Sequence, residues 1–129
     1  MRLFTAFEIS GSALSAQRVR MDTIATNLAN AESTRTPEGG PYQRKMVTFR
    51  EVLNEGVAVA GVVTDPTPGP RVYEPAHPDA DAQGYVQLPN VQVAIEMVDM
   101  ISATRAYEAN VSALTAAKRM ALKALEIGQ

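Results

Sequence analysis

Apolar residues recur at helical spacing at both ends of the chain, whereas the middle lacks this pattern. Near the start they return every seven residues, which keeps them on one side of a helix. This first stripe consists of Phe7, Leu14, Met21 and Leu28, with Phe4, Ile24 and Ala25 beside them. The second stripe consists of Val93, Met97, Met100, Tyr107, Val111, Leu114, Ala121 and Leu125. Two long amphipathic helices cannot each leave a stripe in water, so we expect them to pack on each other or on neighbouring copies.

The pattern therefore predicts an assembly interface rather than a catalytic site. We take this interface to consist of the larger members of both stripes: Phe7, Leu14, Met21, Ile24, Leu28, Val93, Met97, Met100, Tyr107, Val111, Leu114 and Leu125. A stripe of this length buries roughly 1000 Å², which at about 25 cal/mol per Å² is a large free energy. The short middle of the chain cannot cover both stripes, so partners are expected.

The first helix is predicted to begin near Thr5. Thr5 followed by Glu8 fits a capping box, and Phe4 with Ile9 fits the hydrophobic staple that accompanies it. The helix can continue without proline to Ala31, which gives about 25 residues and a length of about 38 Å. A polar stretch rich in proline and glycine then ends it.

The second helix is predicted to begin at Asn90, which suits an N-cap because it follows Pro89 directly and precedes the apolar pattern. No proline or glycine intervenes before Gly128. The expected helix has about 37 residues and a length of about 55 Å. Its charges complement the helix dipole: Glu96 and Asp99 lie near the start, and Lys118, Arg119 and Lys123 lie near the end.

The middle of the chain is predicted to form short strands and loops, because most of its eight prolines lie between residues 37 and 89. Residues 57–63 alternate β-branched with smaller side chains, as a strand does, and we expect this strand to form a hairpin with residues 71–74. Residues 42–53 fit neither period cleanly and are predicted to be a strand followed by a short helical turn. Residues 84–88 add one more strand.

The predicted fold is mainly α with a small β-rich insert. It divides into an N-terminal helix in residues 1–32, a β-rich insert in residues 33–89 and a C-terminal helix in residues 90–129. The length suits one domain. Because two long helices leave few residues for a compact core, that core must be thin or shared with other chains.

Composition excludes several classes of function. Lysine plus arginine number 12 against 14 for aspartate plus glutamate, which argues against a protein that binds nucleic acid by neutralising phosphates. The chain has no cysteine, so disulfides, thiolate nucleophiles and thiolate metal sites are excluded. Its longest apolar stretch, residues 57–63, is far shorter than the roughly 20 residues that cross a bilayer. The first ten residues lack the apolar stretch of a secretory signal, so any export is expected to use a route without a cleaved signal.

No arrangement of residues predicts catalysis, a cofactor or a metal. His77 is the only histidine, so neither a zinc cluster nor a convincing Ser-His pair can be assembled, and we expect it to be an isolated surface residue. Residues 79–84 resemble the opening of a calcium loop, but the twelfth position would be Asn90 instead of glutamate, so we interpret the segment as a polar turn. Gly39 and Gly40 lack the lysine and hydroxyl residue of a phosphate-binding loop.

Two further groups have ordinary interpretations. The basic group near Tyr42 contains Arg44, Lys45 and Arg50 and is surrounded by Glu38, Glu51 and Glu55. We interpret it as a solvated edge rather than a nucleic-acid patch. The methionines of the second helix lie beside Tyr107 and could form either an adaptable binding surface or ordinary core.

The chain resembles a known family over essentially its whole length. FEISGSALSAQRVRM at residues 7–21 and IATNLANA at residues 24–31 are similar to the N-terminal segment shared by bacterial flagellar rod and hook proteins. Other stretches resemble the proximal rod proteins within that family: residues 39–49 beginning GGPYQRK, HPDAD at 77–81, GYV at 84–86, PNV at 89–91, EMVDMI at 96–101 and RAYEANV at 105–111.

The resemblance implies a structural subunit of the flagellar basal-body rod, the shaft that joins the membrane ring to the distal rod and hook. It implies terminal helices that pair as a coiled coil lining an inner tube, with the β-rich insert facing outward. Implied partners are further copies of the chain, other rod proteins, the adaptor proteins between ring and rod, and the flagellar type III export apparatus. The implied location is the periplasmic part of the basal body, without a cleaved signal, and no cofactor, nucleic acid or small-molecule substrate is implied.

Alternatives remain open at this point. The chain could be another rod component of the same family. A different class would be a peripheral membrane-binding protein whose first helix lies on lipid, with Phe4 and Phe7 below and Arg18 and Arg20 above, although two basic residues would bind weakly. An enzyme is a third interpretation, for which no nucleophile and base can be paired. If the chain assembles, we expect its terminal helices to be poorly ordered when free and to gain order as copies meet.

Overall fold

Two long helices and two small antiparallel sheets make up the computed structural model over residues 2–128, the part of the chain that it describes. Helix α1 spans Arg2–Ala29 and helix α2 spans Val93–Ile127. Between them lie β1 (Lys45–Val52), β2 (Gly56–Thr64), β3 (Arg71–Tyr73) and β4 (Tyr85–Gln87). The prediction of a mainly helical chain with a small insert of short strands is confirmed.

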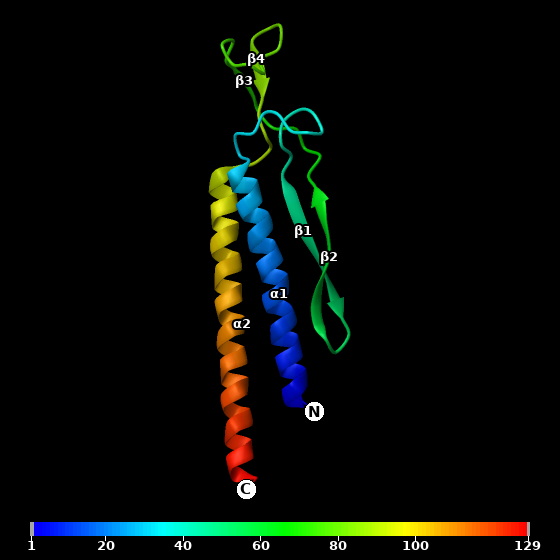
Figure 1. Cartoon of the computed structure of the whole chain (residues 1–129), viewed down its shortest axis with the longest axis vertical. Helices are drawn as coiled ribbons and strands as arrows, with labels where there is room; N and C mark the ends of the chain where they lie inside the picture. Colours follow the sequence, from blue (N-terminus) through cyan, green and yellow to red (C-terminus); the bar gives the residue numbers. More distant parts are fainter. Residues whose placement is uncertain (1, 129) are drawn as a thin grey trace.

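The two helices lie side by side and run in opposite directions along the long axis of the molecule (Figure 1). The buried residues of α2 are Glu96, Ala103 and Ala117. They are separated by multiples of seven residues and so share one side of the helix. That side faces α1, which is the only described helix or strand in contact with α2. Alanine at these positions lets the two backbones approach closely.

Helix α2 is also the longer of the two, with 35 residues against 28 for α1. Its C-terminal part extends beyond the start of α1 (Figure 1). The last turns of α2 therefore have no helix opposite them in the single chain.

Helix α1 begins earlier than predicted. It is already helical at Arg2, so Thr5 and Glu8 lie inside the helix and the predicted capping box is wrong. A local cap contributes only about 1 kcal/mol, whereas most helical stability in proteins comes from the packing of an apolar face. The packing of α1 as a whole therefore outweighs the local signal.

Helix α2 is not capped by Asn90, so that prediction is also wrong. Its N-cap is Gln92, whose side chain makes no capping hydrogen bond. Asn90 instead holds the insert: its side-chain amide donates to the carbonyl oxygens of Asp65 at 3.0 Å and Thr67 at 2.7 Å. Its Oδ1 accepts the backbone N–H of Arg44. These long-range bonds satisfy the side chain outside the helix.

Strands β1 and β2 form an antiparallel hairpin that packs on α1, away from α2 (Figure 1). The strand predicted at residues 57–63 is confirmed within β2, but its partner is β1 and not residues 71–74. The helical turn predicted near the end of residues 42–53 is wrong, because β1 continues to Val52. Asn54 and Gly56 form the turn with φ of 63° and 103°, a conformation that asparagine and glycine adopt at low cost.

The hairpin meets α1 through a close approach at Gly56. The hydroxyl oxygen of Ser12 accepts the N–H of Val57 at 3.1 Å, and the same hydroxyl donates to the carbonyl of Ile9 at 2.8 Å. A Cβ atom on Gly56 would lie 2.2 Å from Ser12 Oγ. Both the positive φ and this contact therefore require a residue without a side chain.

Strands β3 and β4 form the second sheet at the end of the molecule beyond the start of α2 (Figure 1). The strand predicted at residues 84–88 is confirmed as β4. The rings of Tyr73 and Tyr85 meet edge to face with centroids 5.3 Å apart, and the guanidinium of Arg71 lies 4.9 Å from the Tyr85 ring. These aromatic and cation–π contacts lie on the exposed face of the sheet, whereas Val86 of β4 is fully buried on the other face.

Asp79 ties this end sheet to the loop after α1. Its carboxylate accepts the hydroxyl of Thr34 at 2.7 Å and pairs with Arg35. The Thr34 hydrogen bond, followed by the contacts with Arg35, lowers the pKa of Asp79. His77 accepts the N–H of Asp79 at Nδ1. Asp81 accepts two backbone N–H groups at 2.9 Å, so the polar turn predicted for residues 79–84 is confirmed.

Candidate assembly interface

The predicted interface residues fall into two groups in the single chain. One group is buried or half-buried: Phe7, Leu14, Met21, Ile24, Leu28, Met100, Tyr107 and Leu114. The other group is exposed, with fractions of 43% for Val93, 54% for Met97, 41% for Val111 and 66% for Leu125. Helix α1 thus covers only part of the apolar stripe of α2. Contact between these residues and other copies of the chain stays a prediction.

Among the half-buried predicted residues of α1, Met21 contacts α2. The hydroxyl of Thr104 on α2 lies 3.8 Å from the sulfur of Met21. Leu14 and Leu28 are seven residues from Met21 in either direction, so helical geometry puts them on the same side. Helical geometry therefore places these heptad residues of α1 on the side that carries the Met21 contact.

A second surface of α2 lies outside the contact with α1. It carries no charged residue and combines large apolar with small side chains at spacings of three and four residues. We call it the outer stripe: Ile95, Val98, Ser102, Ala106, Ala109, Ala113, Ala116 and Met120. All of these residues are exposed except Ala106, which is half-buried. Sequence reasoning missed this stripe because serine and alanine do not register as an apolar pattern.

Further large apolar side chains are exposed on the hairpin, namely Phe49, Leu53, Val62 and Val63. Single exposed apolar residues are ordinary on protein surfaces, but contiguous apolar surface marks an interaction site. The outer stripe is contiguous along α2, whereas the hairpin residues lie across α1 from it. The chain therefore presents apolar surface on two separate sides.

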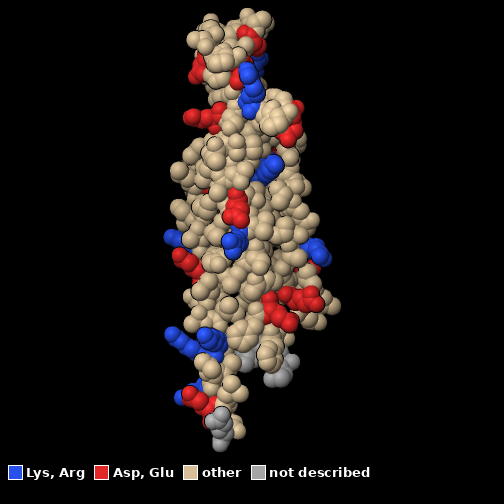
Figure 2. Space-filling view, in the orientation of Figure 1, with Lys and Arg blue, Asp and Glu red and all other residues tan. Residues whose placement is uncertain are grey.

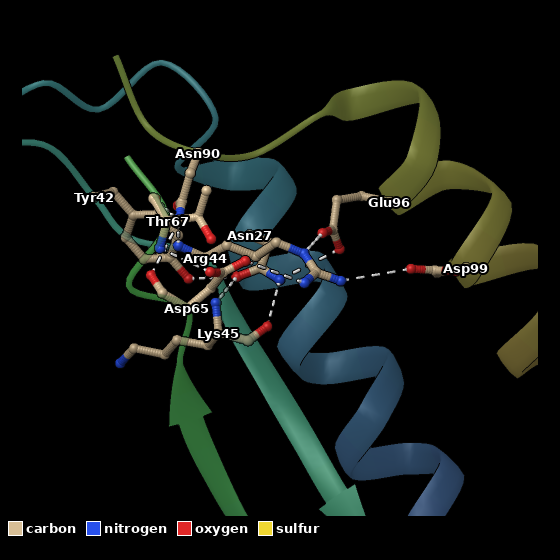
Figure 3. A network of polar contacts seen from close by, with 9 residues as sticks. All are labelled: Asn27, Tyr42, Arg44, Lys45, Asp65, Thr67, Asn90, Glu96 and Asp99. Carbon is tan, nitrogen blue, oxygen red and sulfur yellow. Dashed lines mark hydrogen bonds and ion pairs between the residues drawn. The ribbon is translucent and has the colours of Figure 1, made fainter. Parts of the chain in front are cut away.

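Arg44 joins the insert to the start of α2 (Figure 3). Its guanidinium pairs with Glu96 and lies 3.8 Å from Asp65 Oδ2 and 3.7 Å from Asp99 Oδ2. The side chain of Glu96 is 1% exposed and that of Arg44 is 24% exposed. Arg44 therefore lies in a shielded ion-pair cluster, and its interpretation as part of a solvated edge is wrong.

The acidic start of α2 needs a corresponding correction. Glu96 is in the first turn, as expected from the dipole argument, but it is buried and bonded to Arg44. Removing one partner of a buried ion pair leaves an uncompensated charge, which typically costs about 3–5 kcal/mol. Glu96 thus acts mainly as a partner for the insert.

Asn27 joins α1 to the first residue of β1. Its Nδ2 donates to the carbonyl of Lys45 at 2.9 Å, and its Oδ1 accepts the N–H of Lys45 at 3.0 Å. Oδ1 also accepts the hydroxyl of Tyr42 at 2.7 Å, and Nδ2 lies 3.3 Å from Glu96 Oε2. Burial, and then the charge of Glu96, raises the pKa of Tyr42, which keeps its hydroxyl a hydrogen-bond donor.

These side chains form one connected set, seen from close by in Figure 3. We call it the corner network: Asn27, Tyr42, Arg44, Asp65, Asn90, Glu96 and Asp99. It connects the end of α1, the start of α2 and the open end of the hairpin, where β1 begins and β2 ends. The corner network therefore fixes the position of the insert on the helix pair.

The only sequence signal for this network is a polar residue directly beside a large apolar residue of a helix. Asn27 lies one residue before Leu28, and Glu96 lies one residue after Ile95. The partners of these two residues are 15 to 69 positions away in the chain. No local pattern encodes contacts at that separation.

Within residues 2–128, no group of three or more histidine, cysteine, aspartate or glutamate side chains is placed to hold a metal ion. Over the same residues, every buried side-chain nitrogen or oxygen has a hydrogen-bond partner. Neither described helix combines the length and the apolar character that crossing a membrane requires.

Two protein families match segments at the two ends of the chain, and individual relatives match its whole length. The family described as "Flagella basal body rod protein" matches residues 7–35, and "Flagellar basal body rod FlgEFG protein C-terminal" matches residues 82–127. The chain is 47% identical to the flagellar basal-body rod protein FlgC of Yersinia enterocolitica, 48% to that of Escherichia coli O157:H7 and 46% to that of Bacillus subtilis strain 168. In each case the match covers 100% of both chains. The chain belongs to the FlgC family of flagellar basal-body rod proteins.

Membership in the FlgC family confirms the resemblance found in the sequence. It also identifies the exposed helix faces as surfaces of a rod subunit. The two partial matches coincide with the terminal helices, since residues 7–35 include most of α1 and residues 82–127 include α2. A FlgC-family chain is a structural component of the flagellar basal body. The membrane-surface alternative is not favoured, because Phe7 is half-buried in the fold. The full-length FlgC matches likewise favour this family over another rod component.

Proposed function

We propose that this chain polymerises through its terminal helices into the proximal rod, the drive shaft that transmits torque from the membrane ring to the distal rod and hook. The observation that carries the proposal is the apolar surface of α2 that α1 leaves open, both on the outer stripe and at Val93, Met97, Val111 and Leu125. Neighbouring subunits cover this surface in the rod. Within each subunit α1 and α2 act as a coiled-coil pair that faces the inner tube.

Torque transmission requires that each subunit behave as a stiff body. The corner network supports this role because its buried ion pair and amide bonds connect both helices with the insert. The hairpin adds a second attachment near the other end of α1 at Gly56 and Ser12. An insert held at two separated points cannot pivot freely on the helices.

The proposal includes partners and a location. The subunit contacts further copies of itself, other rod proteins and the adaptor proteins between ring and rod. It reaches the periplasm through the flagellar type III export apparatus without a cleaved signal. Its role is structural and not enzymatic, with no nucleic acid and no small-molecule substrate. These points rest on membership in the family and on the exposed helix faces.

An aspartate placed on the outer stripe tests the proposal. Val98 is exposed in the single chain, so Val98→Asp leaves the monomer fold intact while putting a charge where a neighbouring subunit packs. The expected result is export of the variant without rod assembly and therefore loss of motility. Val98→Thr is the matched control, because it keeps the size and branching of the side chain at the same exposed position and adds no charge. Normal motility of the Val98→Asp strain contradicts the proposal.

A further inference from the structure

The end of the β1–β2 hairpin is acidic around one exposed apolar side chain. Leu53 is 81% exposed, and Glu51 and Glu55 are exposed on either side of it. We call these three residues the hairpin end. Figure 2 shows acidic atoms gathered where the hairpin turns, on the side of the molecule away from α2.

The last third of α2 has the complementary composition. It exposes the basic residues Lys118, Arg119 and Lys123 and the apolar residues Met120 and Leu122. We call residues 118–123 the α2 tail. Basic atoms lie along the same part of α2 in Figure 2, on the opposite side of the molecule from the hairpin end.

Of these charged residues, Lys123 alone has an ionic partner within residues 2–128, namely Glu126 at 3.8 Å. Over residues 2–128, Glu51, Glu55, Lys118 and Arg119 take part in no salt bridge. Helix α1 lies between the hairpin and α2, and these two do not contact each other in the described part of the chain. The hairpin end therefore cannot reach its own α2 tail.

The two surfaces lie at similar levels along the long axis. Gly56, next to the hairpin end, packs on Ile9 and Ser12 in the first half of α1. Because α2 runs antiparallel to α1, its later turns lie beside that half (Figure 1). Two copies placed side by side with a small axial offset thus bring a hairpin end to an α2 tail.

We infer that the hairpin end of one copy docks on the α2 tail of a second copy beside it. Leu53 packs on Leu122, while Glu51 and Glu55 face Lys118 and Arg119, which lie four and three residues before Leu122 and so share its side of the helix. Such a charged rim around an apolar contact fixes register and rejects wrong partners. The inference rests on the proposed function and specifies one contact between its copies.

The geometry of this contact determines the form of the assembly. The two surfaces are different patches on opposite sides of the subunit, so the interface is heterologous. A heterologous interface repeats from copy to copy and gives a ring or an open helix instead of a closed dimer. Each subunit donates one hairpin end and accepts another.

Cysteine cross-linking tests the contact directly, because the chain has no cysteine of its own. Leu53→Cys is combined in turn with Met120→Cys and Leu122→Cys in a strain that lacks the natural gene, and isolated basal bodies are oxidised. A disulfide requires Cα atoms within about 7 Å, so we expect cross-linked dimers and larger multiples in at least one combination. Leu53→Cys with Ile95→Cys is the matched control, because Ile95 is exposed at the other end of α2; it should give none. Basal bodies that contain both test variants at the wild-type level without cross-links overturn the inference.

Charge exchange gives an independent test where a cysteine variant fails to enter the rod. Glu51→Lys with Glu55→Lys should lower motility, and so should Lys118→Glu with Arg119→Glu. Combining all four changes should restore it, because the charges again match across the interface. A combined variant no better than the poorer parent overturns the inference. Absence of the unmodified chain from basal bodies instead refutes the proposed function, so the two failures are distinguishable.

Discussion

Replacing Asn27 with alanine should destabilise the subunit more than any other single change to a polar residue of α1. Asn27 is 1% exposed, and its side-chain amide makes four hydrogen bonds, to Lys45 (two), Tyr42 and Glu96. Asn27→Ala removes all four and leaves their partners in a buried site. The variant therefore detaches the first residue of β1 from the end of α1.

The magnitude follows from the number of bonds and their burial. A hydrogen bond contributes about 0.5–1.5 kcal/mol net, and a buried group left without a partner costs about 1–3 kcal/mol. Because water can reach some of the freed groups, we expect a total loss of about 2–4 kcal/mol. That is a large part of the 5–15 kcal/mol that stabilises an ordinary domain, and it corresponds to a lower Tm by about 10 °C.

Denaturant unfolding of the purified chain, followed by circular dichroism, measures this loss. Asn30→Ala is the matched control, because Asn30 lies one turn later and bonds only to nearby groups, donating to the carbonyl of Thr26 and accepting from Ser33. We expect that control to lose less than about 1 kcal/mol. Equal losses in the two variants would refute the reasoning, since they would mean that the corner network is not formed in the free chain.

Three further predictions concern the hairpin, the end sheet and the free chain. Gly56→Ala should lower the free energy of unfolding by more than about 2 kcal/mol, because it combines a positive φ with contact on Ser12. Gly61→Ala, with open space around it, should change that free energy by less than about 1 kcal/mol. Equal unfolding midpoints in the two variants would contradict the docking geometry. The Thr34 and Arg35 contacts lower the pKa of Asp79, and the Tyr85 N–H bond lowers the pKa of Asp81. The two carboxylates therefore stabilise the end sheet fully above the ordinary aspartate pKa of about 4. This stabilisation is lost as the pH falls through their lower pKa values in the folded chain. The protection of the amides in residues 71–87, relative to the intrinsic exchange rate at each pH, should therefore fall at acid pH, and less so in Asp79→Asn. The same acid response in both chains would contradict the assignment. Helix content by circular dichroism should rise when the dilute chain assembles, and full content before assembly would oppose the expectation of poorly ordered free helices.

The helical part of the fold was predictable because its signal is long and periodic. Heptad spacing from Phe7 to Leu28 indicates a helix over many turns, and the apolar pattern after Asn90 does the same. Both helices are present, but their starts at Arg2 and Val93 differ from the predictions. A start depends on a few local bonds that tertiary packing outweighs, so it is the least predictable part of a helix.

The pairing of β1 with β2 could have been predicted from the residues of the turn between them. Asn54 and Gly56 adopt positive φ in the turn between β1 and β2, and asparagine and glycine close together between two strands favour a tight hairpin. Residues 71–74 instead pair with β4. The short connection should have been preferred, because neighbouring strands usually pair with each other.

The sequence predicted which residues form the candidate interface, but not which of them pack within the chain and which are left for other chains. The spacing of Met100, Tyr107 and Leu114 equals that of residues facing a partner helix, but it does not say whether that helix belongs to the same chain. The structure answers this for α1, which covers these three residues more than it covers Val93 or Leu125. The bonds of the corner network depend on three-dimensional proximity and have no counterpart in a local pattern.

We propose that the open faces of α2 are covered only when many copies form a shaft. Electron cryotomography of basal bodies in a strain that lacks this chain is the direct test. We expect a membrane ring without a distal shaft, and restoration of the shaft when the chain is supplied again. A complete rod and hook in the deleted strain would contradict it.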